Sequence, residues 1–399
     1  MRVAINAHLL AFSADYRQAG LSRYIYEMVR LLPGAMPGDR FTAFVGNAPV
    51  PPDFAAALPP NLRLSPSRFP TQRAPVRIAW EQLVLPFAAR RSRSGVLFCP
   101  VNVRPVVSPC PTVVTIHDVI FLRYPKAFHP LKRMYLTAMT GWSARHAARV
   151  VTVSEATRQD VIDLLGVAPE RVTTVHNGVS EQFRPVAHQA KREFLARQGV
   201  EGRVVLYVGT LEPRKNLTVL LQSFASVASK PGMEDVTLII GGSKGWYYDE
   251  VFATAERLGL GTSGRVRFLG RVPDDDLPLW YNVATVFAYP SLYEGFGLPA
   301  LEAMACGTPV VVSTTPALRE VVSESGLTVD PHDTAGWAAA LERLLAGGPE
   351  AERLREMGPR RASLFTWERS AAATARVLAE AAQQGKRRST LTKGRRART

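Results

Sequence analysis

The chain has 399 residues, of which 46% are hydrophobic, and a formal net charge of +15 at pH 7. Because one hydrophobic core seldom serves more than about 250–300 residues, this length predicts two domains. No segment approaches the roughly 20 apolar residues of a membrane-spanning helix, and residues 2–6 have the pattern of a strand rather than of a secretory leader. The sequence therefore predicts a cytoplasmic protein.

The positive charge is concentrated at the C-terminal end. Residues 385–399 contain seven lysines and arginines and no acidic residue. A segment this polar is typical of a disordered, solvated tail, and attraction to anionic lipid headgroups or to nucleic acid is the alternative. Most of the concentrated positive charge lies in this tail and not on a folded surface. We therefore expect no nucleic-acid partner.

Cysteine usage argues against two kinds of site. Cys99, Cys110 and Cys306 are odd in number, widely separated and without C-x-x-C spacing. Neither a disulfide framework nor a zinc site is indicated, so we expect reduced thiols.

Short apolar runs alternate with helical patterns along almost the whole chain. This alternation is typical of parallel sheets with helical crossovers, and the second half repeats the rhythm of the first. Turn residues and a proline interrupt it at residues 177–185, so the sequence predicts an α/β protein with two Rossmann-like, doubly wound sheets. The predicted strands are residues 3–6, 41–46, 96–100, 113–116, 150–153 and 172–175, then 204–209, 236–241, 266–269, 286–289, 309–313 and 327–329.

The strongest local motif is the run Gly-Thr-Leu-Glu-Pro-Arg-Lys-Asn at residues 209–216. It follows a predicted strand and precedes a segment with helical spacing of leucines and a phenylalanine. Arg214 and Lys215 are therefore expected at a helix N-terminus, where backbone N–H groups add positive potential. A guanidinium fork beside an ammonium charge suits a diphosphate, although a solvated pair of cations in a loop has the same spacing.

A second motif follows the predicted strand 286–289. It places Glu294 in a loop, two glycines after it, and Glu302 in the first turns of a helix. Glycines let the backbone approach a ligand closely, and each carboxylate can accept paired hydrogen bonds from sugar or ribose hydroxyls. A plain turn before a helix explains Glu302 but gives no reason for Glu294 or for the glycines.

Together these motifs resemble glycosyltransferase family 4. The resemblance rests on the E-x7-E spacing of Glu294 and Glu302, the run 209–216, His117 after a strand, and residues 176–179, and it covers nearly the whole chain. It implies the GT-B fold, with two Rossmann-like domains facing each other across a cleft. It also implies transfer of a sugar from a nucleotide diphosphate sugar with retention of configuration.

The family's organisation implies four segments. Residues 1–182 would form the N-terminal acceptor domain and residues 183–364 the domain that binds the nucleotide sugar. Residues 365–384 would form a terminal helix that crosses back to the first domain, and residues 385–399 the basic disordered tail.

On matching residues the resemblance implies a division of roles. Arg214 and Lys215 would hold the diphosphate and neutralise the charge that grows on the leaving group. Glu294 would bind hydroxyls of the donor sugar, Glu302 the ribose hydroxyls, and His117 the donor sugar from the other domain. Further donor contacts are expected from Gly20, Gly209, Arg271, Val272, Phe296, Gly297 and Leu298, of which Gly20 stands where many relatives have paired glycines.

The resemblance also implies a mechanism without a protein nucleophile. In front-face substitution the leaving phosphate takes the proton of the acceptor, so Glu294 would position the sugar rather than act as a general base. No cofactor and no metal are expected, because Arg214 and Lys215 supply the positive charge. We interpret the acidic residues 274–276 as the capped start of a helix rather than as metal ligands.

The substrates are less closely defined. The run 209–216 looks like that of family mannosyltransferases and favours GDP-mannose, while UDP-sugars stay open. A glycan or lipid-linked acceptor in cell-surface polysaccharide or glycolipid synthesis is expected. The alternatives are a non-catalytic partner subunit that binds nucleotide sugar and a GT-B sugar phosphorylase.

Residues 131–149 combine basic and large apolar side chains at helical spacing. Such a segment can rest on an anionic membrane, which would make the protein peripheral at the inner face, or it can be a helix that faces the core.

Overall fold

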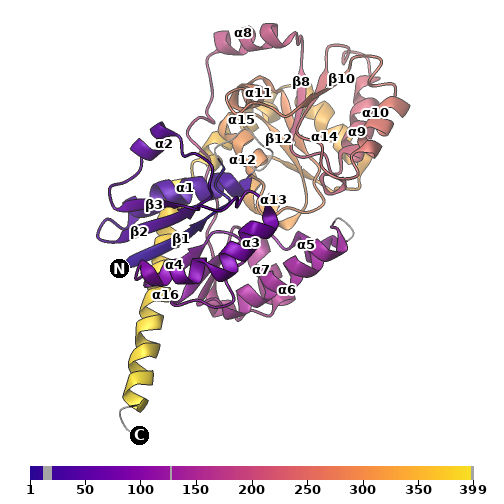
Figure 1. Cartoon of the computed structure of the whole chain (residues 1–399). Coiled ribbons are helices and arrows are strands. Elements are labelled where there is room, and N and C mark those ends of the chain that lie inside the picture. Colours follow the sequence, from indigo (N-terminus) through magenta and orange to yellow (C-terminus); the bar gives the residue numbers. More distant parts are fainter. Residues whose placement is uncertain (12–19, 126–127, 397–399) are drawn as a thin grey trace. The chain divides into compact units, whose positions relative to one another are not determined.

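The computed structural model describes residues 1–11, 20–125 and 128–396, with side chains described up to residue 385. The chain divides into two compact units, one formed by Met1–Gly178 with Trp367–Thr399 and the other by Val179–Thr366. These junctions lie within a few residues of those expected from the sequence. The last helix belongs to the first unit (Figure 1).

The first unit is built around a seven-stranded parallel sheet with the order β3-β2-β1-β4-β5-β6-β7. Its strands are β1 (Arg2–Ala7), β2 (Arg40–Val45), β3 (Leu62–Pro66), β4 (Val96–Cys99), β5 (Thr112–Ile116), β6 (Arg149–Thr152) and β7 (Val172–Thr174). Its helices are α1 (Gly20–Ala35), α2 (Pro52–Ala56), α3 (Ala74–Leu83), α4 (Leu85–Arg91), α5 (Ile120–Arg123), α6 (Pro130–His146), α7 (Glu155–Leu165), η3 (Pro169–Arg171) and α16 (Trp367–Arg396).

The second unit contains a six-stranded parallel sheet with the order β10-β9-β8-β11-β12-β13. Its strands are β8 (Val204–Val208), β9 (Thr237–Gly241), β10 (Val266–Gly270), β11 (Val286–Tyr289), β12 (Val310–Ser313) and β13 (Leu327–Val329). Its helices are α8 (His188–Gln198), η4 (Pro213–Lys215), α9 (Leu217–Ala228), α10 (Asp249–Arg257), α11 (Leu277–Val283), α12 (Leu298–Ala305), α13 (Pro316–Val322), α14 (Thr334–Leu345) and α15 (Pro349–Ala362).

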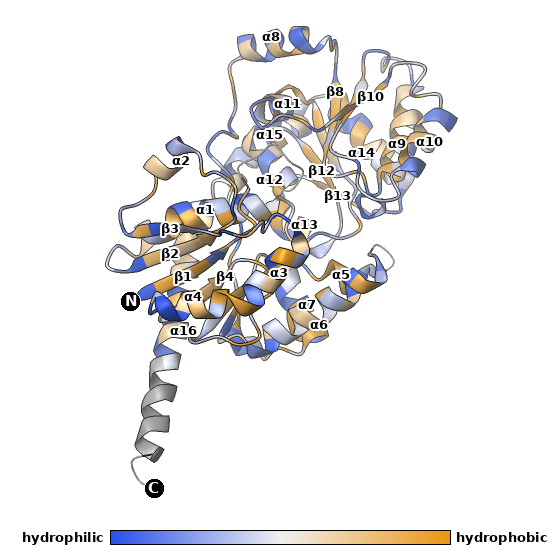
Figure 2. Cartoon of the chain, in the orientation of Figure 1, coloured by the Kyte–Doolittle hydropathy of each residue, from blue (hydrophilic) through white to orange (hydrophobic). Residues whose placement is uncertain are grey.

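The strands form the core because their side chains are apolar on both faces. Every residue of β4, β5, β11 and β12 is buried, and Figure 2 shows the strands among the most apolar parts of the ribbon. Two-sided burial is what helices on both faces of a parallel sheet produce. No helix in the described residues is long and apolar enough to cross a membrane.

The structure departs from the expected elements at two places. Strand β3 (Leu62–Pro66) was not predicted, because this edge strand is half exposed and ends in a proline, so it lacks the apolar run of a buried strand. Helix α16 continues to Arg396, past the end expected at residue 384. Residues 386–396 contain no proline and are rich in Lys and Arg, which favour helix.

A buried histidine follows β1. The ring centroids of His8 and Trp80 are 3.9 Å apart, and neither nitrogen of His8 has a hydrogen-bond partner among the described residues. Burial, with a smaller contribution from the charge of Arg77, lowers the pKa of His8 from 6.5 to about 4.

We expect His8 to make the free energy of unfolding fall as the pH is lowered from 6.5 to 4. In this window the unfolded chain binds a proton at His8 that the folded chain does not, so acid favours unfolding by up to about 3 kcal/mol. The variant His8→Phe keeps a ring beside Trp80 but cannot titrate. Urea unfolding should therefore show a smaller acid-induced loss of stability in the variant, and equal pH dependence in both proteins would contradict the prediction.

Candidate active site

Strands β8 and β11 are neighbours in the second sheet, although two other strands, β9 and β10, lie between them in sequence. The direction in which strands are added reverses between them, and doubly wound sheets bind ligands at such a switch point, beyond the carboxyl ends of the strands. The two sequence motifs follow these two strands. A hydrogen bond from the backbone N–H of Leu292 to the carbonyl of Arg214, with an N···O distance of 2.8 Å, joins the two loops.

The cations of the first motif pair directly with the carboxylate of the second. Lys215 Nζ lies 2.6 Å from Glu294 Oε1 and 2.5 Å from the hydroxyl of Tyr289. A guanidinium nitrogen of Arg214 lies 3.0 Å from the same Glu294 oxygen, and another lies 2.6 Å from Glu212 Oε1. The side chain of Lys215 is only 8% exposed, so the cluster is not a pair of solvated loop cations.

Charge and burial act against each other at these side chains. Burial alone would raise the pKa of Glu294, but the charges of Arg214 and Lys215 outweigh it and bring the pKa to about 2. Burial lowers the pKa of Lys215, and the like charge of Arg214 lowers it further. Burial also raises the pKa of the Tyr289 hydroxyl, and the negative charge of Glu294 adds to the increase.

A tight turn places the two cations. Arg214 and Lys215 lie in the 3-10 turn η4, which ends two residues before α9 begins, so they stand just ahead of the helix N-terminus to which the sequence assigns them. Asn216 ends this turn in the left-handed conformation, with φ of 56°. Its amide donates hydrogen bonds to the carbonyls of Pro290 and Pro331, at 3.2 and 2.6 Å, which hold the turn against the loops after β11 and β13.

Helix α12 carries the second glutamate of the motif. Glu302 is buried, and the hydroxyl of Tyr281 donates to its Oε2 at 2.9 Å. Gly297 precedes the helix with φ of 115°, and a Cβ there would lie 2.5 Å from Leu318 Cδ2. The glycine is thus required by the backbone conformation and by packing. Phe296 is buried before it, and Leu298 begins the helix.

Other predicted donor contacts lie at the same edge of this sheet. Gly209 follows β8, and its carbonyl lies so close to Gly242 that a Cβ on Gly242 would be 1.9 Å away. Arg271 and Val272 follow β10, and Val272 is buried against Gly241. Their contacts with a nucleotide stay predictions.

The first unit holds the remaining two predicted residues. His117 follows β5, with its Nε2 2.9 Å from the carbonyl of Pro100 and its ring edge-on to Tyr24 at 4.7 Å between centroids. Burial lowers the pKa of His117, so its neutral form is favoured. Gly20 is the exposed first residue of α1. Neither residue belongs to the unit that contains the Arg214–Lys215–Glu294 cluster.

The acidic run before α11 behaves differently from the expectation. Asp276 is the N-cap residue, but its side chain accepts no backbone hydrogen bond and instead lies 2.9 Å from a guanidinium nitrogen of Arg197. The prediction that this side chain caps the helix was therefore wrong. The backbone of Asp276 is already helical, so its carboxylate does not accept a hydrogen bond from the first N–H groups. Within the described residues, no three His, Cys, Asp or Glu side chains are grouped to hold a metal ion. The described cysteines are free thiols.

Sequence reasoning missed the polar side chains that support the cluster. Tyr289 contacts Lys215, Tyr281 contacts Glu302, and Glu212 pairs with Arg214. Tyr289 is the last residue of β11, so its position at a carboxyl end was a usable signal. Tyr281 lies on a helix between strands, and no local pattern connects it with Glu302.

Comparison with known proteins agrees with this arrangement. The family description "Glycosyltransferase Family 4" matches residues 19–183, and "Glycosyl transferases group 1" matches residues 202–347. The Escherichia coli O-antigen chain mannosyltransferase B is 37% identical over 263 residues, covering 64% of this chain and 67% of the relative. The D-inositol 3-phosphate glycosyltransferase of Salinispora tropica is 35% identical over 254 residues, covering 61% of this chain. The chain spans about half the length of that second relative, 53%.

Solved structures with the same architecture cover nearly the whole chain. The sucrose-phosphate synthase of Thermosynechococcus elongatus has a TM-score of 0.74 at 22% identity, covering 95% of this chain and 98% of its own. The Anabaena protein HepE in complex with UDP and glucose has a TM-score of 0.73 at 19% identity, and the match covers 95% of this chain and 100% of HepE. At these identities the likeness shows the GT-B fold. With that fold, the paired motifs at the switch point and the matched relatives, this chain belongs to glycosyltransferase family 4.

Proposed function

We propose that the chain transfers a hexose, with mannose preferred, from a nucleotide diphosphate sugar to a glycan or lipid-linked acceptor. The process would be synthesis of a cell-surface polysaccharide or glycolipid. The observation that carries the proposal is the largely buried cluster of Arg214, Lys215 and Glu294 at the switch point of the second sheet. The mannosyltransferase name of the E. coli relative supports the choice of sugar.

The two cations suit a diphosphate leaving group. Breaking the glycosidic bond increases the negative charge on the phosphate, and Arg214 and Lys215 are held in place before that charge develops. Preorganised charges stabilise a transition state more than mobile ones, because no reorganisation is required during the reaction. The low exposure of both side chains strengthens the interaction further.

Glu294 is suited to positioning rather than to proton transfer. A general base works best with a pKa near the working pH, and the pKa of Glu294 is about 2. A carboxylate that stays ionised can accept hydrogen bonds from sugar hydroxyls. Retention of configuration at the anomeric carbon would then follow from front-face substitution, in which the leaving phosphate takes the proton of the acceptor. Measuring the anomeric configuration of the product by NMR tests this step.

The proposed reaction does not depend on a metal, because Arg214 and Lys215 provide the charge that a divalent cation would supply. Transfer should continue in EDTA, and a strict requirement for Mg²⁺ or Mn²⁺ would contradict this part of the proposal. A contact of His117 with the donor sugar also belongs to the proposal.

The start of α6 supports a lipid-linked acceptor. Leu131 and Met134 are 66% and 64% exposed, and the exposed cations Lys132 and Arg133 lie between them. Apolar side chains beside cations are typical of segments that rest on anionic membranes. The later residues Thr140 and Ala144 are buried, so only the first turns of the helix could make this peripheral contact.

A donor screen tests the proposed function. We expect GDP-mannose to raise the melting temperature more than UDP-glucose or UDP-N-acetylglucosamine, because a ligand that binds only the folded state stabilises it. Slow hydrolysis of the same donor in the absence of an acceptor should accompany the shift. Preference for a UDP-sugar would change the assigned donor. Identical melting with every nucleotide sugar would contradict the function itself.

A further inference from the structure

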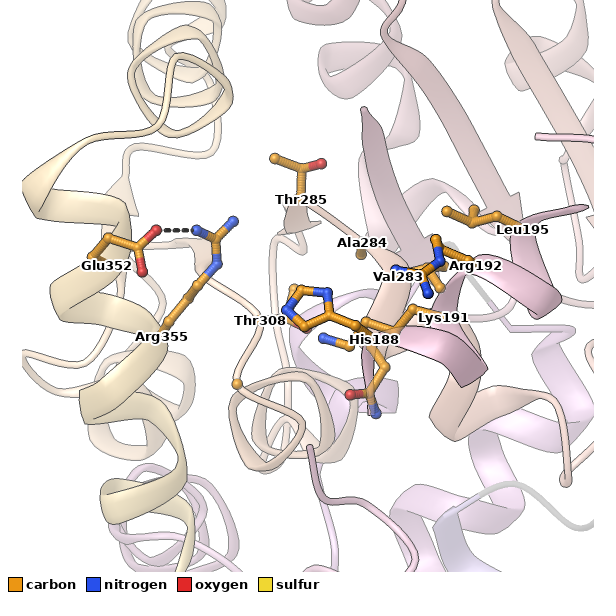
Figure 3. Close-up of a pocket in the computed structure, with 12 residues that line it drawn as sticks. His188, Lys191, Arg192, Leu195, Val283, Ala284, Thr285, Thr308, Glu352 and Arg355 are labelled. Atoms are coloured by element: carbon orange, nitrogen blue, oxygen red, sulfur yellow. Dashed lines mark hydrogen bonds and ion pairs between the residues drawn. The ribbon is translucent and has the colours of Figure 1, made fainter. Parts of the chain in front are cut away.

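A second charged pocket lies in the second unit, away from the predicted donor contacts. It has a volume of about 520 Å³ and is lined by α8, α15 and the segments that precede β11 and β12 (Figure 3). The donor motifs follow the carboxyl ends of β8 and β11, whereas this pocket lies at the amino ends of β11 and β12. Because the strands are parallel, the two sites lie at opposite edges of the sheet.

The distance between the pocket and the donor motifs follows from the length of the strand between them. Strand β11 (Val286–Tyr289) has four residues, and each residue advances a strand by about 3.3 Å, so the two edges are about 13 Å apart. Thr285 and Thr308, which line the pocket, precede the first residues of β11 and β12. A ligand in this pocket would therefore not occupy the Arg214–Lys215–Glu294 cluster.

The charged side chains around the pocket are mainly cationic. Lys191 and Arg192 come from α8, and Arg355 comes from α15 on the other side, with His188 between them (Figure 3). The single carboxylate in the lining, Glu352, is exposed and is bound by Arg355 at 2.6 Å. Among the described residues, neither Lys191 nor Arg192 has a carboxylate within ion-pair distance.

The positive charge is therefore only partly balanced within the pocket. Lys191 and Arg355 are half-buried on facing walls, and burial followed by the charge of Arg355 lowers the pKa of Lys191. An anion between them would reduce this repulsion. A guanidinium fork beside an ammonium group favours phosphate oxygens in particular.

We propose that the pocket lined by His188, Lys191, Arg192 and Arg355 binds a small phosphorylated molecule at a second site, distinct from the donor site. The volume fits a sugar phosphate or a pyrophosphate-sized anion more closely than a macromolecule. The site does not depend on the proposed donor or acceptor.

The test uses the full chain in a variant that lacks one of the two cations of the donor site. In the Lys215→Ala background, isothermal titration calorimetry with inorganic pyrophosphate and with glucose 1-phosphate should still detect binding. Adding Lys191→Gln or Arg355→Gln should weaken it about tenfold each, since each removes one charge-assisted contact. A stronger response to glucose 1-phosphate would identify a sugar phosphate, and a stronger response to pyrophosphate a free polyphosphate.

A matched control lies on α15, the helix that carries Arg355. Arg353 is exposed, contacts Met357 Sδ at 3.2 Å and does not line the pocket. Arg353→Gln should therefore leave binding unchanged. Absence of binding at millimolar pyrophosphate and glucose 1-phosphate would overturn the proposal, as would binding that Lys191→Gln and Arg355→Gln leave unaltered. Near-ultraviolet circular dichroism of each variant reports whether it is folded.

Discussion

Replacing Lys215 with alanine should lower kcat for sugar transfer by two to three orders of magnitude. Lys215 Nζ is held 2.6 Å from Glu294 and 2.5 Å from the hydroxyl of Tyr289, so its charge is fixed where we place the leaving diphosphate. Removing one preorganised group that stabilises developing charge typically costs about 10²–10³ in rate. The rise in melting temperature caused by the donor should disappear in the same variant, as measured by thermal shift with GDP- and UDP-sugars.

Two further variants separate chemistry from folding. Lys215→Met keeps an unbranched apolar stem but removes the ammonium group that lies 4.8 Å from the centroid of the Tyr289 ring, so it should lose activity while retaining the folded structure. Lys230 forms a half-exposed pair with Glu342, and Lys230→Ala should change kcat by less than twofold. Transfer by Lys215→Met within fivefold of the native rate would show that this cation does not stabilise the leaving group.

The positions of most strands were predictable because these strands carry a simple signal. Residues 286–289 and 309–313 are short apolar runs bounded by turn residues, which is what two-sided burial demands of a central parallel strand. The edge strand β3 lacks this signal, since half of its surface faces solvent. The sequence therefore missed β3, although it located the other edge strands, β7, β10 and β13.

The site was predictable in its residues but less so in its contacts. Parallel strands bring their carboxyl ends to one edge, so motifs that follow the neighbouring strands β8 and β11 lie close together. That Glu294 would neutralise both Arg214 and Lys215 was not foreseen, because the two cations had been assigned to a phosphate and the glutamate to a sugar. The same contact explains why all three side chains can lie largely out of solvent, since an isolated charge there would be too costly.

Glu294 thus has a structural role in addition to its proposed contact with the sugar. It balances two neighbouring cations, and a diphosphate would bring further negative charge to the same groups. We expect Glu294, with Glu212 as a second carboxylate on Arg214, to fix the cations in position, while the diphosphate competes with these carboxylates for the N–H groups of Arg214 and Lys215. Replacing the carboxylate by an amide separates these contributions, because the amide keeps the shape and hydrogen bonding but removes the charge.

Glu294→Gln should reduce the free energy of unfolding by about 3–5 kcal/mol, the range for breaking a buried ion pair by removing one partner. The deficit should stay constant from pH 8 to about 5, as measured by urea unfolding. The folded-state pKa of Glu294, about 2, lies below the ordinary 4.5, so its contribution is fully present above 4.5 and is lost only as the pH falls towards 2. Glu342→Gln, which breaks the exposed pair with Lys230, should cost at most about 1 kcal/mol. A deficit that shrinks between pH 7 and 6 would mean that Glu294 titrates near neutrality, and would restore general-base catalysis as an explanation for this residue.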